Sequence, residues 1–366
     1  MNYFLPIHLG APDYFNYLNN LVPLMLNTPC PNQSPLHSIG IANASEEVEG
    51  LICLTENTIT NSKPESLGPY LAGLFEGDGH IVLSKSIINN SSQRIKYTSP
   101  SIAITFVNKD LPLINKLLEK YGGRLRFKNK ENAIVWIINI HKELVTMINL
   151  LNGYLRTPKL IKFNELIIWL NNKYNYNIPI HSPDTNDLNE NGWLAGFIDA
   201  DGGFKIRYTE KLICEKTSKV LRKGRIEVRF ALEQRKNIIN SLSGKEISLN
   251  IEYSYEAIML QIYSFFGLST DLRQSTHNVD GATTYFIVEV TSLTKLNKLI
   301  QYLQTYPLLT AKRNDFEDWV KVYNLMFDNK HLTDSGKLLI KQIKSNMNRK
   351  RGVFNWDHLN YLNKVQ

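Results

Sequence analysis

Two stretches of the chain share one pattern of apolar and small residues. The apolar positions at helical spacing are Leu67, Tyr70, Leu71, Leu74 and Phe75 in the first stretch, and Trp193, Phe197 and Ile198, with Leu194 beside them, in the second. Small residues four apart, Gly73 with Gly77 and Gly196 with Ala200, form a second face in each. Glycine inside a helix costs roughly 1 kcal/mol relative to alanine. We therefore expect these small residues to let two helices pack closely against each other.

The same order of elements follows each of these helices. In the first half, strands are expected at 80–84, 95–108, 124–128 and 133–140, and helices at 110–121, 142–152 and 158–173. In the second half, strands are expected at 204–208, 225–233, near Arg273 and at 283–290, and helices at 253–266, 292–304 and 311–327. Asp110 is the expected N-cap of its helix. The repeated order predicts an α+β fold of two pseudo-symmetric αββαββα halves.

Composition divides the chain into five expected segments. Residues 1–62 form an acidic leader without Lys or Arg, expected to be flexible or exon-derived, and residues 63–180 form the first domain. A linker rich in Pro, Asp and Asn spans 181–190, and the second domain spans 191–328. The basic tail at 329–366 has two interpretations: a solvated helix face, or a contact to nucleic-acid backbone.

Positive charge is concentrated after the leader. The leader carries −5 and the whole chain +8, so the remaining residues carry +13. Together with a pI near 9.1, this favours a polyanionic partner such as nucleic acid. Cys30, Cys53 and Cys214 are too few and too far apart for a disulfide framework or a zinc site, which favours a reducing compartment. No apolar run approaches the roughly 18 residues of a membrane span, so no membrane partner is expected.

Each predicted helix ends in an acid followed by glycine. The two stretches read LAGLFEGDG at 71–79 and LAGFIDADG at 194–202, with Asp78 and Asp201 at the helix ends. A carboxylate is unfavourable at a helix C-terminus, and two neighbouring carboxylates repel each other. A hard divalent cation, Mg²⁺ or Mn²⁺, bound with substrate phosphate oxygens would relieve both problems. The alternative, an ordinary Asp-Gly turn after a helix, fits one copy better than two.

These two motifs resemble the LAGLIDADG homing endonucleases in the form that carries both motifs in one chain. The resemblance covers residues from Leu67 onward and implies a monomer with internal pseudo-two-fold symmetry, whose two four-stranded antiparallel sheets bind a long double-stranded DNA site. It also implies hydrolysis of one phosphodiester in each strand by metal ions held at Asp78 and Asp201. Glu76 and Asp199, two residues earlier, are expected to orient the helix ends.

Accessory residues follow from the same resemblance. Asn108 and Gln234, which close their second strands, and Lys142, after the fourth strand, match the family's accessory catalytic positions. Ser292 stands where a second lysine is expected, which predicts unequal active sites, and Lys312 could also reach inward. The expected DNA-binding residues on the strands are Lys85, Arg94, Lys96, Arg124, Arg126, Lys128, Lys205, Arg207, Arg225, Arg229 and Arg273.

Three functions are compatible with these features. The preferred function is a Mg²⁺-dependent, site-specific DNA endonuclease. The alternatives are an RNA maturase that assists splicing of its own group I intron, with or without DNA cleavage, and a non-catalytic DNA-binding protein. The retained acids disfavour the last. Family members are often encoded within introns, and the acidic, arginine-free leader does not resemble a transit peptide. We therefore expect a mitochondrial protein synthesised inside the organelle.

Overall fold

The computed structural model describes residues 67–83, 86–88, 95–97, 99–238, 253–277 and 283–363. The chain divides into two units, Met1–Thr60 and Asn61–Gln366, and every described residue belongs to the second. The leader expected at 1–62 therefore lies outside the described residues. No helix in the described ranges is both long enough and apolar enough to cross a membrane.

The first half follows the predicted order. Its elements are α2 (Gly68–Asp78), β1 (Gly79–Val82), β2 (Ser86–Ile88), β3 (Ile95–Tyr97), β4 (Ser101–Val107), the 3₁₀ turn η1 (Asn108–Asp110), α3 (Leu111–Tyr121), β5 (Arg124–Lys128), η2 (Asn129–Glu131), β6 (Ala133–Ile138), α4 (His141–Leu151) and α5 (Lys159–Tyr174). The strand expected at 95–108 is divided between β3 and β4.

The second half repeats this order and then continues. Its elements are α6 (Trp193–Asp201), β7 (Gly202–Thr209), β8 (Leu212–Ile213), β9 (Val220–Arg222), β10 (Arg225–Arg235), α7 (Glu256–Phe265), β11 (Arg273–His277), β12 (Thr283–Val290), α8 (Leu293–Thr305) and α9 (Lys312–Phe327). The C-terminal segment adds η4 (Lys330–Leu332), α10 (Asp334–Ser345), η5 (Asn348–Lys350) and η6 (Asp357–Asn363).

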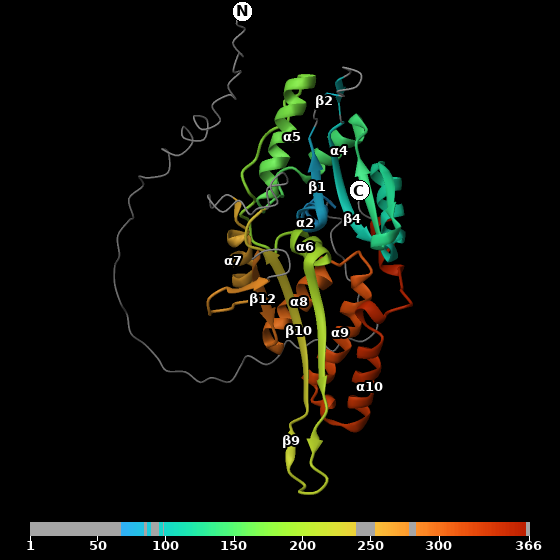
Figure 1. The fold of residues 1–366 in the computed structure, drawn as a ribbon, viewed down its shortest axis with the longest axis vertical. Helices are drawn as coiled ribbons and strands as arrows, with labels where there is room; N and C mark the ends of the chain where they lie inside the picture. The colour runs from blue at the N-terminus through green and yellow to red at the C-terminus, as the bar shows by residue number, and fades with distance from the viewer. Residues whose placement is uncertain are drawn as a thin grey trace, which may run out of the picture. The chain divides into compact units, whose positions relative to one another are not determined.

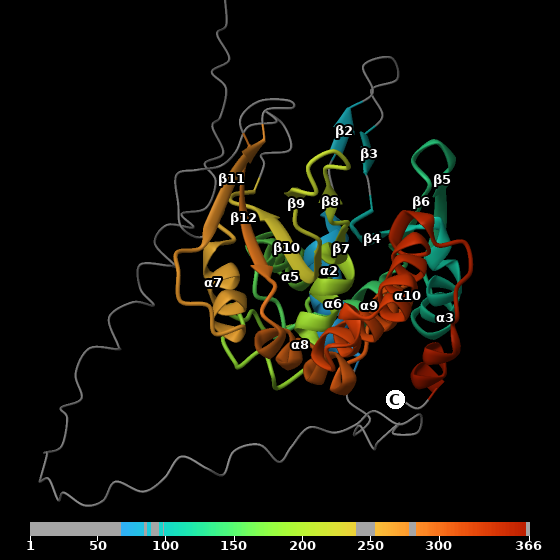
Figure 2. The same ribbon diagram turned by 90° about the horizontal axis from the view of Figure 1, so that it is seen from below.

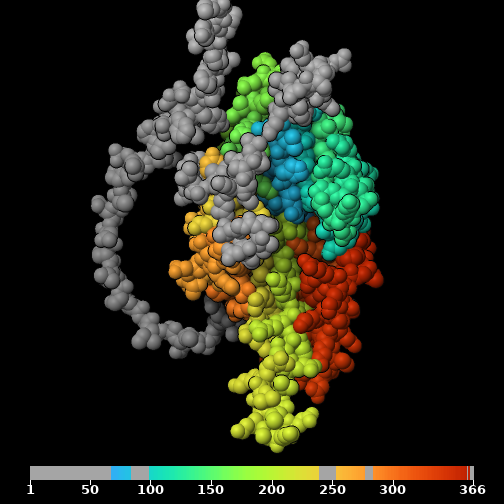
Figure 3. Space-filling model, viewed as in Figure 1, coloured from blue at the N-terminus to red at the C-terminus, as the bar shows by residue number. Residues whose placement is uncertain are grey.

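Two antiparallel sheets have the same strand order. The first runs β1-β4-β6-β5, and the second, read in the same sense, runs β7-β10-β12-β11. Helices α3, α8 and α9 lie on one side of the sheets, and the two-stranded ribbons β2–β3 and β8–β9 extend toward the other (Figure 2). The β8–β9 ribbon projects beyond the second sheet (Figures 1 and 3). The α+β fold of two similar halves is thus confirmed.

Side-chain alternation along the strands separates the core from the outer faces. In β7, Phe204 and Ile206 are buried while Lys205 and Arg207 are exposed, as expected for a sheet that covers helices on one face. Within 329–363, Ile340, Met347, Leu359 and Leu362 are buried in the main core. This segment therefore packs as part of the fold.

Candidate catalytic centre and nucleic-acid interface

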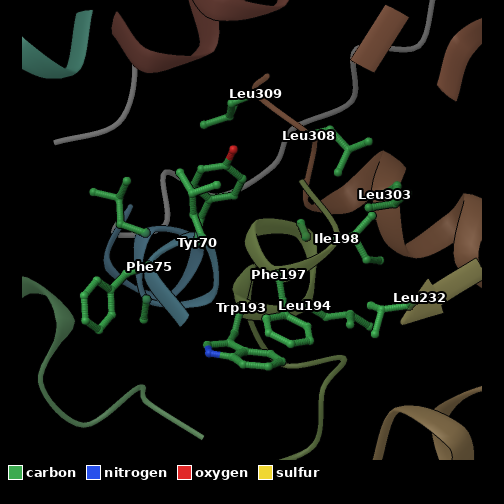
Figure 4. Packing of buried hydrophobic residues seen from close by; sticks show 14 of the residues in the cluster. Tyr70, Phe75, Trp193, Leu194, Phe197, Ile198, Leu232, Leu303, Leu308 and Leu309 are labelled. Atoms are coloured by element: carbon green, nitrogen blue, oxygen red, sulfur yellow. The ribbon is translucent and has the colours of Figure 1, made fainter. Parts of the chain in front are cut away.

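Helices α2 and α6 pack backbone to backbone. A Cβ atom at Gly73 would lie 1.9 Å from the carbonyl oxygen of Trp193, and one at Gly196 would lie 1.9 Å from that of Tyr70. Only glycine allows so close an approach. Large side chains, including Tyr70, Trp193 and Phe197, fill the space around the helix pair (Figure 4). The close contact predicted from the small residues is therefore confirmed.

Glu76, near the end of α2, joins three parts of the chain. Its buried carboxylate accepts hydrogen bonds from the backbone N–H groups of Arg156 (2.8 Å) and Thr157 (2.6 Å). It also accepts one from Nε1 of Trp193, the first residue of α6, at 2.8 Å. Burial raises the pKa of Glu76, and these donors lower it. Glu76 thereby fixes the loop before α5 and ties it to the other motif helix.

Asp199 holds the corresponding loop, before α9, in the second half. Its carboxylate accepts from the backbone N–H of Leu309 (2.7 Å) and from the N–H and hydroxyl of Thr310 (3.2 and 2.6 Å). The hydroxyl of Tyr70, on α2, donates to it at 2.6 Å. Glu76 and Asp199 thus orient backbone around the helix ends, as expected from the sequence.

Each of these loops leads directly to a lysine. Lys159, the first residue of α5, donates from Nζ to the carbonyl oxygens of Gly77 (2.7 Å) and Gly79 (2.8 Å). Lys312, the first residue of α9, donates to those of Ile198 (2.8 Å) and Ala200 (3.2 Å). Two cations therefore satisfy carbonyl groups at the C-termini of α2 and α6, where positive charge is favourable.

The sequence prediction included Lys312 only as a side chain that could reach inward, and it missed Lys159. A signal was present, because a Thr-x-Lys triplet opens the last helix of both halves, at 157–159 and 310–312. Burial lowers the pKa of Lys159 to about 8, against the opposing effect of Asp201 and other nearby acids. Lys159 therefore remains mainly protonated at pH 7.

Asp78 and Asp201 end the two motif helices within electrostatic reach of each other. Asp78 is partly exposed. Partial burial and, after it, the nearby Asp201 carboxylate raise the pKa of Asp78 to about 6, although Lys312 and Lys159 act to lower it. Burial also raises the pKa of Asp201, which the same two lysines lower. Nε2 of Gln234 donates to Oδ2 of Asp201 at 3.0 Å. The centre therefore joins two acids, two lysines and one amide.

Strand register does not make Asn108 the counterpart of Gln234. Gly79 pairs with Ile104 in the first sheet, and Gly202 pairs with Leu232 in the second. Gln234 therefore corresponds to the buried Phe106. Asn108 lies two residues further on, in η1, and its Oδ1 is buried without a hydrogen-bond partner among the described residues.

Lys142 and Ser292 also differ from the predicted pairing. Lys142 is exposed in the first turn of α4, and Ser292 is the N-cap of α8. Because α4 begins at His141 and α8 at Leu293, Lys142 corresponds to Thr294. The pair of lysines at the ends of the motif helices is Lys159 with Lys312.

The predicted DNA-binding residues occupy the outer faces of both sheets where they are described. By strand alternation these are Arg124, Arg126, Lys128, Lys205, Arg207, Arg225, Arg229 and Arg273. Lys85 and Arg94 lie outside the described residues, and Lys96 belongs to β3.

The two outer faces differ in polarity. In the second sheet, Arg229 lies opposite Lys205 and is paired with Glu227 (3.0 Å) and Glu289 (2.8 Å). In the first sheet, Ala103, Val135 and Ile137 form a small buried cluster separate from the main core. The first face is therefore more apolar at its centre than the sequence prediction of basic and polar positions indicated.

The chemistry of the two acids fits a hard divalent cation. Carboxylate oxygens are the ligands Mg²⁺ prefers, and this ion commonly binds through one or two carboxylates plus water and substrate phosphate. Because the pKa values of both acids are raised, the two lysines offset only part of the effect of burial at Asp201, and of burial and the Asp201 charge at Asp78. In the described residues, no cluster of three or more His, Cys, Asp or Glu side chains could enclose a metal ion. A cation here would complete its shell with other oxygen ligands.

The fold and this centre define a class: a single chain with two similar halves, joined by a close helix pair that ends in paired acids and paired lysines. The family model described as LAGLIDADG endonuclease matches residues 71–170 and 194–323. The chain belongs to the LAGLIDADG endonuclease family, as its motifs predicted.

Three curated relatives support this placement. Intron-encoded DNA endonuclease aI3 of Saccharomyces cerevisiae is 33% identical over 317 residues, which cover 81% of this chain and 72% of the relative. An uncharacterized cox1 intron-2 protein of Schizosaccharomyces pombe is 30% identical over 286 residues, covering 75% and 71%. A shorter match, 30% over 144 residues, is to Intron-encoded RNA maturase bI4 of Saccharomyces cerevisiae and covers 39% of this chain and 20% of the relative.

Solved structures share the fold at low sequence identity. Meganuclease I-SmaMI bound to uncleaveable DNA superposes with a TM-score of 0.57 and 18% identity, covering 78% of this chain and 97% of that one. The LAGLIDADG homing endonuclease I-GzeII in complex with its DNA target gives 0.53 and 19%, covering 78% and 99%.

Proposed function

We propose that this protein is a site-specific DNA endonuclease that acts as a monomer and cuts both strands of a long duplex. The observation that carries the proposal is the helix pair α2–α6, which brings Asp78 and Asp201 together at the starts of β1 and β7, the first strands of two sheets with Arg and Lys side chains on their outer faces. Strands on the major groove of DNA are an established way to read base sequence. The family membership and the DNA endonuclease among the relatives support the same function.

In this function, each side chain of the centre has a distinct role. Asp78 and Asp201 would hold Mg²⁺ or Mn²⁺, which supplies an activated water and stabilises the leaving oxygen. Lys159 and Lys312 place positive charge beside the scissile phosphates while satisfying the helix carbonyls. Gln234 fixes the Asp201 carboxylate. The outer-face Arg and Lys residues hold the DNA backbone, and that contribution should weaken as salt is raised.

The test is cleavage of a gene copy from which the intron is absent. We expect the wild-type protein with Mg²⁺ to cut this DNA at one place, and chelation of the metal to stop cutting. Asp78→Asn or Asp201→Asn should lower the rate of double-strand cleavage more than about a hundredfold, while DNA binding is retained. Wild-type protein that binds the duplex but never cuts it, with any divalent metal, would refute the proposal.

RNA binding is a second candidate, favoured by one surface cluster and by the maturase relative. The ring of His141 stacks on Tyr176 and packs at a tilt against Tyr174, with Nε2 of His141 2.7 Å from the Tyr176 hydroxyl. Both tyrosines are about two-fifths exposed, and exposed rings can stack on unpaired bases. Intron RNA binding that Tyr174→Ala with Tyr176→Ala weakens, while DNA cutting is unchanged, would support this function. Equal RNA binding by both proteins would exclude this surface.

The expected chain organisation and origin extend the proposal. We place the domains at 63–180 and 191–328, the linker at 181–190, the basic tail at 329–366 and the acidic leader without Lys or Arg at 1–62. The relatives named as intron-encoded support an organelle gene, and we propose a mitochondrial one. Detection of the protein in purified mitochondria, together with its coding sequence in an intron of the mitochondrial genome, tests this assignment.

A further inference from the structure

The loops that carry Lys159 and Lys312 are held by different parts of the chain. In the first half, Arg156 extends from the loop to the linker, donating from Nη1 to the carbonyl oxygen of Asn186 and from Nη2 to Oδ2 of Asp184, both at 2.6 Å. The Arg156–Asp184 pair is almost fully buried, with side-chain exposures of 1% and 4%. The linker thereby fixes the loop before Lys159.

In the second half, the corresponding loop residue is Leu309, which cannot make such a pair. Its peptide group is held from two sides instead. The N–H of Thr310 donates to Asp199 at 3.2 Å, and the carbonyl oxygen of Leu309 lies 3.0 Å from Nε2 of His358. His358 belongs to η6, close to the C-terminus of the chain. The two sides of one peptide unit are therefore held by the motif helix and by the C-terminal segment.

The chemistry of His358 suits this contact. Burial lowers the pKa of His358, so its imidazole is neutral at pH 7 and can donate a hydrogen bond through only one nitrogen. A carbonyl oxygen accepts, so Nε2 carries the proton. The ring also stacks on Trp356, with centroids 5.6 Å apart. This packing fixes the direction in which Nε2 points.

The C-terminal segment that contains His358 also contacts the first turn of α9, whose first residue is Lys312. The side chain of Asn314 accepts from the N–H of Asn355 at 2.7 Å and donates to its carbonyl oxygen at 3.0 Å. Nε of Arg351 donates to Oδ1 of Asp315 at 2.7 Å. Both α9 residues are buried, so these contacts anchor the helix start from inside the fold.

We propose that residues 348–363 form a strap that positions Lys312, with His358 as its positioning residue, in the role that the linker and Arg156 have for Lys159. The proposal rests on the endonuclease function proposed above. Lys159 binds carbonyl oxygens at the end of α2, and Lys312 binds those at the end of α6. A change in the strap therefore affects only the half of the centre that contains Lys312. The strap therefore tunes cleavage of one DNA strand, although it contains no residue at the centre.

Two variants at one position test the strap. His358→Ala removes the hydrogen bond, and His358→Gln retains an N–H donor that can reach the carbonyl. The matched control is His181→Ala, which removes an exposed imidazole from the linker. Amide hydrogen exchange is measured first, in the DNA-free protein. We expect exchange at Leu309 and Thr310 to quicken about tenfold in His358→Ala, the effect of one lost hydrogen bond on local opening, and to remain near wild type in His358→Gln and the control.

Strand-specific cleavage is measured second, on a duplex with the two strands labelled separately. We expect His358→Ala to slow cleavage of one strand about three- to tenfold, because one hydrogen bond that positions Lys312 is lost, and to change the cleavage rate of the other strand by less than about twofold. Equal slowing of both strands, or unchanged exchange at Leu309 and Thr310, overturns the strap. If the wild type cuts neither strand, the endonuclease function fails instead, and the exchange result still decides whether the segment holds the loop.

Discussion

Replacing Gly73 or Gly196 by alanine tests the close contact between α2 and α6. Helix propensity alone predicts that either change stabilises the protein by about 1 kcal/mol. The structure predicts the opposite, because the new Cβ would lie 1.9 Å from a backbone carbonyl oxygen of the partner helix. Backbone in a helix cannot rotate away as a side chain does, so the helices themselves must separate.

The magnitude follows from the distance. Relieving the contact requires the helices to move apart by roughly 1 Å, a gap that forfeits about a quarter to a half of the dispersion attraction along the facing surfaces. Overpacking of this kind typically costs about 1–3 kcal/mol or more, and a backbone obstacle places it at the upper end. After subtracting the gain in propensity, we expect a net loss of about 2 kcal/mol for each variant. This corresponds to a fall in Tm of about 4–8 °C.

Thermal unfolding followed by circular dichroism measures this effect, with Gly203→Ala as the control. Gly203 lies in β7, and a Cβ there would make only an ordinary contact, 3.7 Å from the carbonyl oxygen of Ala231. We expect the control to change Tm by no more than about 2 °C. DNA cleavage should fall about a hundredfold in Gly73→Ala and Gly196→Ala, because the paired acids move with the helices. An unchanged or raised Tm in either variant would show that the backbone contact does not constrain the helix pair.

Three further predictions concern single side chains. Gln234→Leu should slow cleavage of one DNA strand about tenfold and spare the other, since Phe106 occupies the corresponding position in the first half; equal slowing of two separately labelled strands would contradict this. Burial raises the pKa of Asp110 from 3.8 to about 6, so its ionisation disfavours the folded state progressively as pH rises through that range. Asp110→Asn should raise the free energy of unfolding in urea by up to about 3 kcal/mol at pH 7.5 but by only about 0.5 kcal/mol at pH 4. An equal gain at both pH values would exclude ionisation as the cause. Tyr70→Phe removes a buried 2.6 Å hydrogen bond to Asp199 and should lower the free energy of unfolding in urea by about 1.5–3 kcal/mol. Gln234→Leu should not lower this free energy in the same way.

The fold and the paired acids could be predicted because they depend on local patterns. The helical spacing of apolar residues, the small-residue face and the terminal acid all occur twice, and each constrains the next. The Thr-x-Lys triplet was an equally regular signal. The resemblance instead places the lysine after the fourth strand, at Lys142, whereas Lys159 lies one helix later in the chain.

Contacts between distant segments could not be predicted in this way. In the sequence, Asn108 and Gln234 correspond because each closes a predicted strand, but only the pairing of Gly79 with Ile104 and of Gly202 with Leu232 reveals the offset of two residues. Asp110 does occupy the N-cap position of α3, yet its carboxylate accepts from the N–H of Ala311, at the start of α9 in the other half, at 2.8 Å. No local sequence signal specifies that partner.

The structure separates positions at which the two halves can diverge from those at which they cannot. At the helix pair, each glycine faces the backbone of the other helix, so a change on either side displaces both acids. The strands and loops have no such mutual constraint: Phe106 stands opposite Gln234 in the repeat, and Arg156 opposite Leu309. A duplex target without two-fold symmetry requires different reading faces but a shared point of cleavage. Divergence in the sheets and their supporting segments, around a helix contact that leaves no room for a Cβ atom at Gly73 or Gly196, satisfies both requirements in one chain.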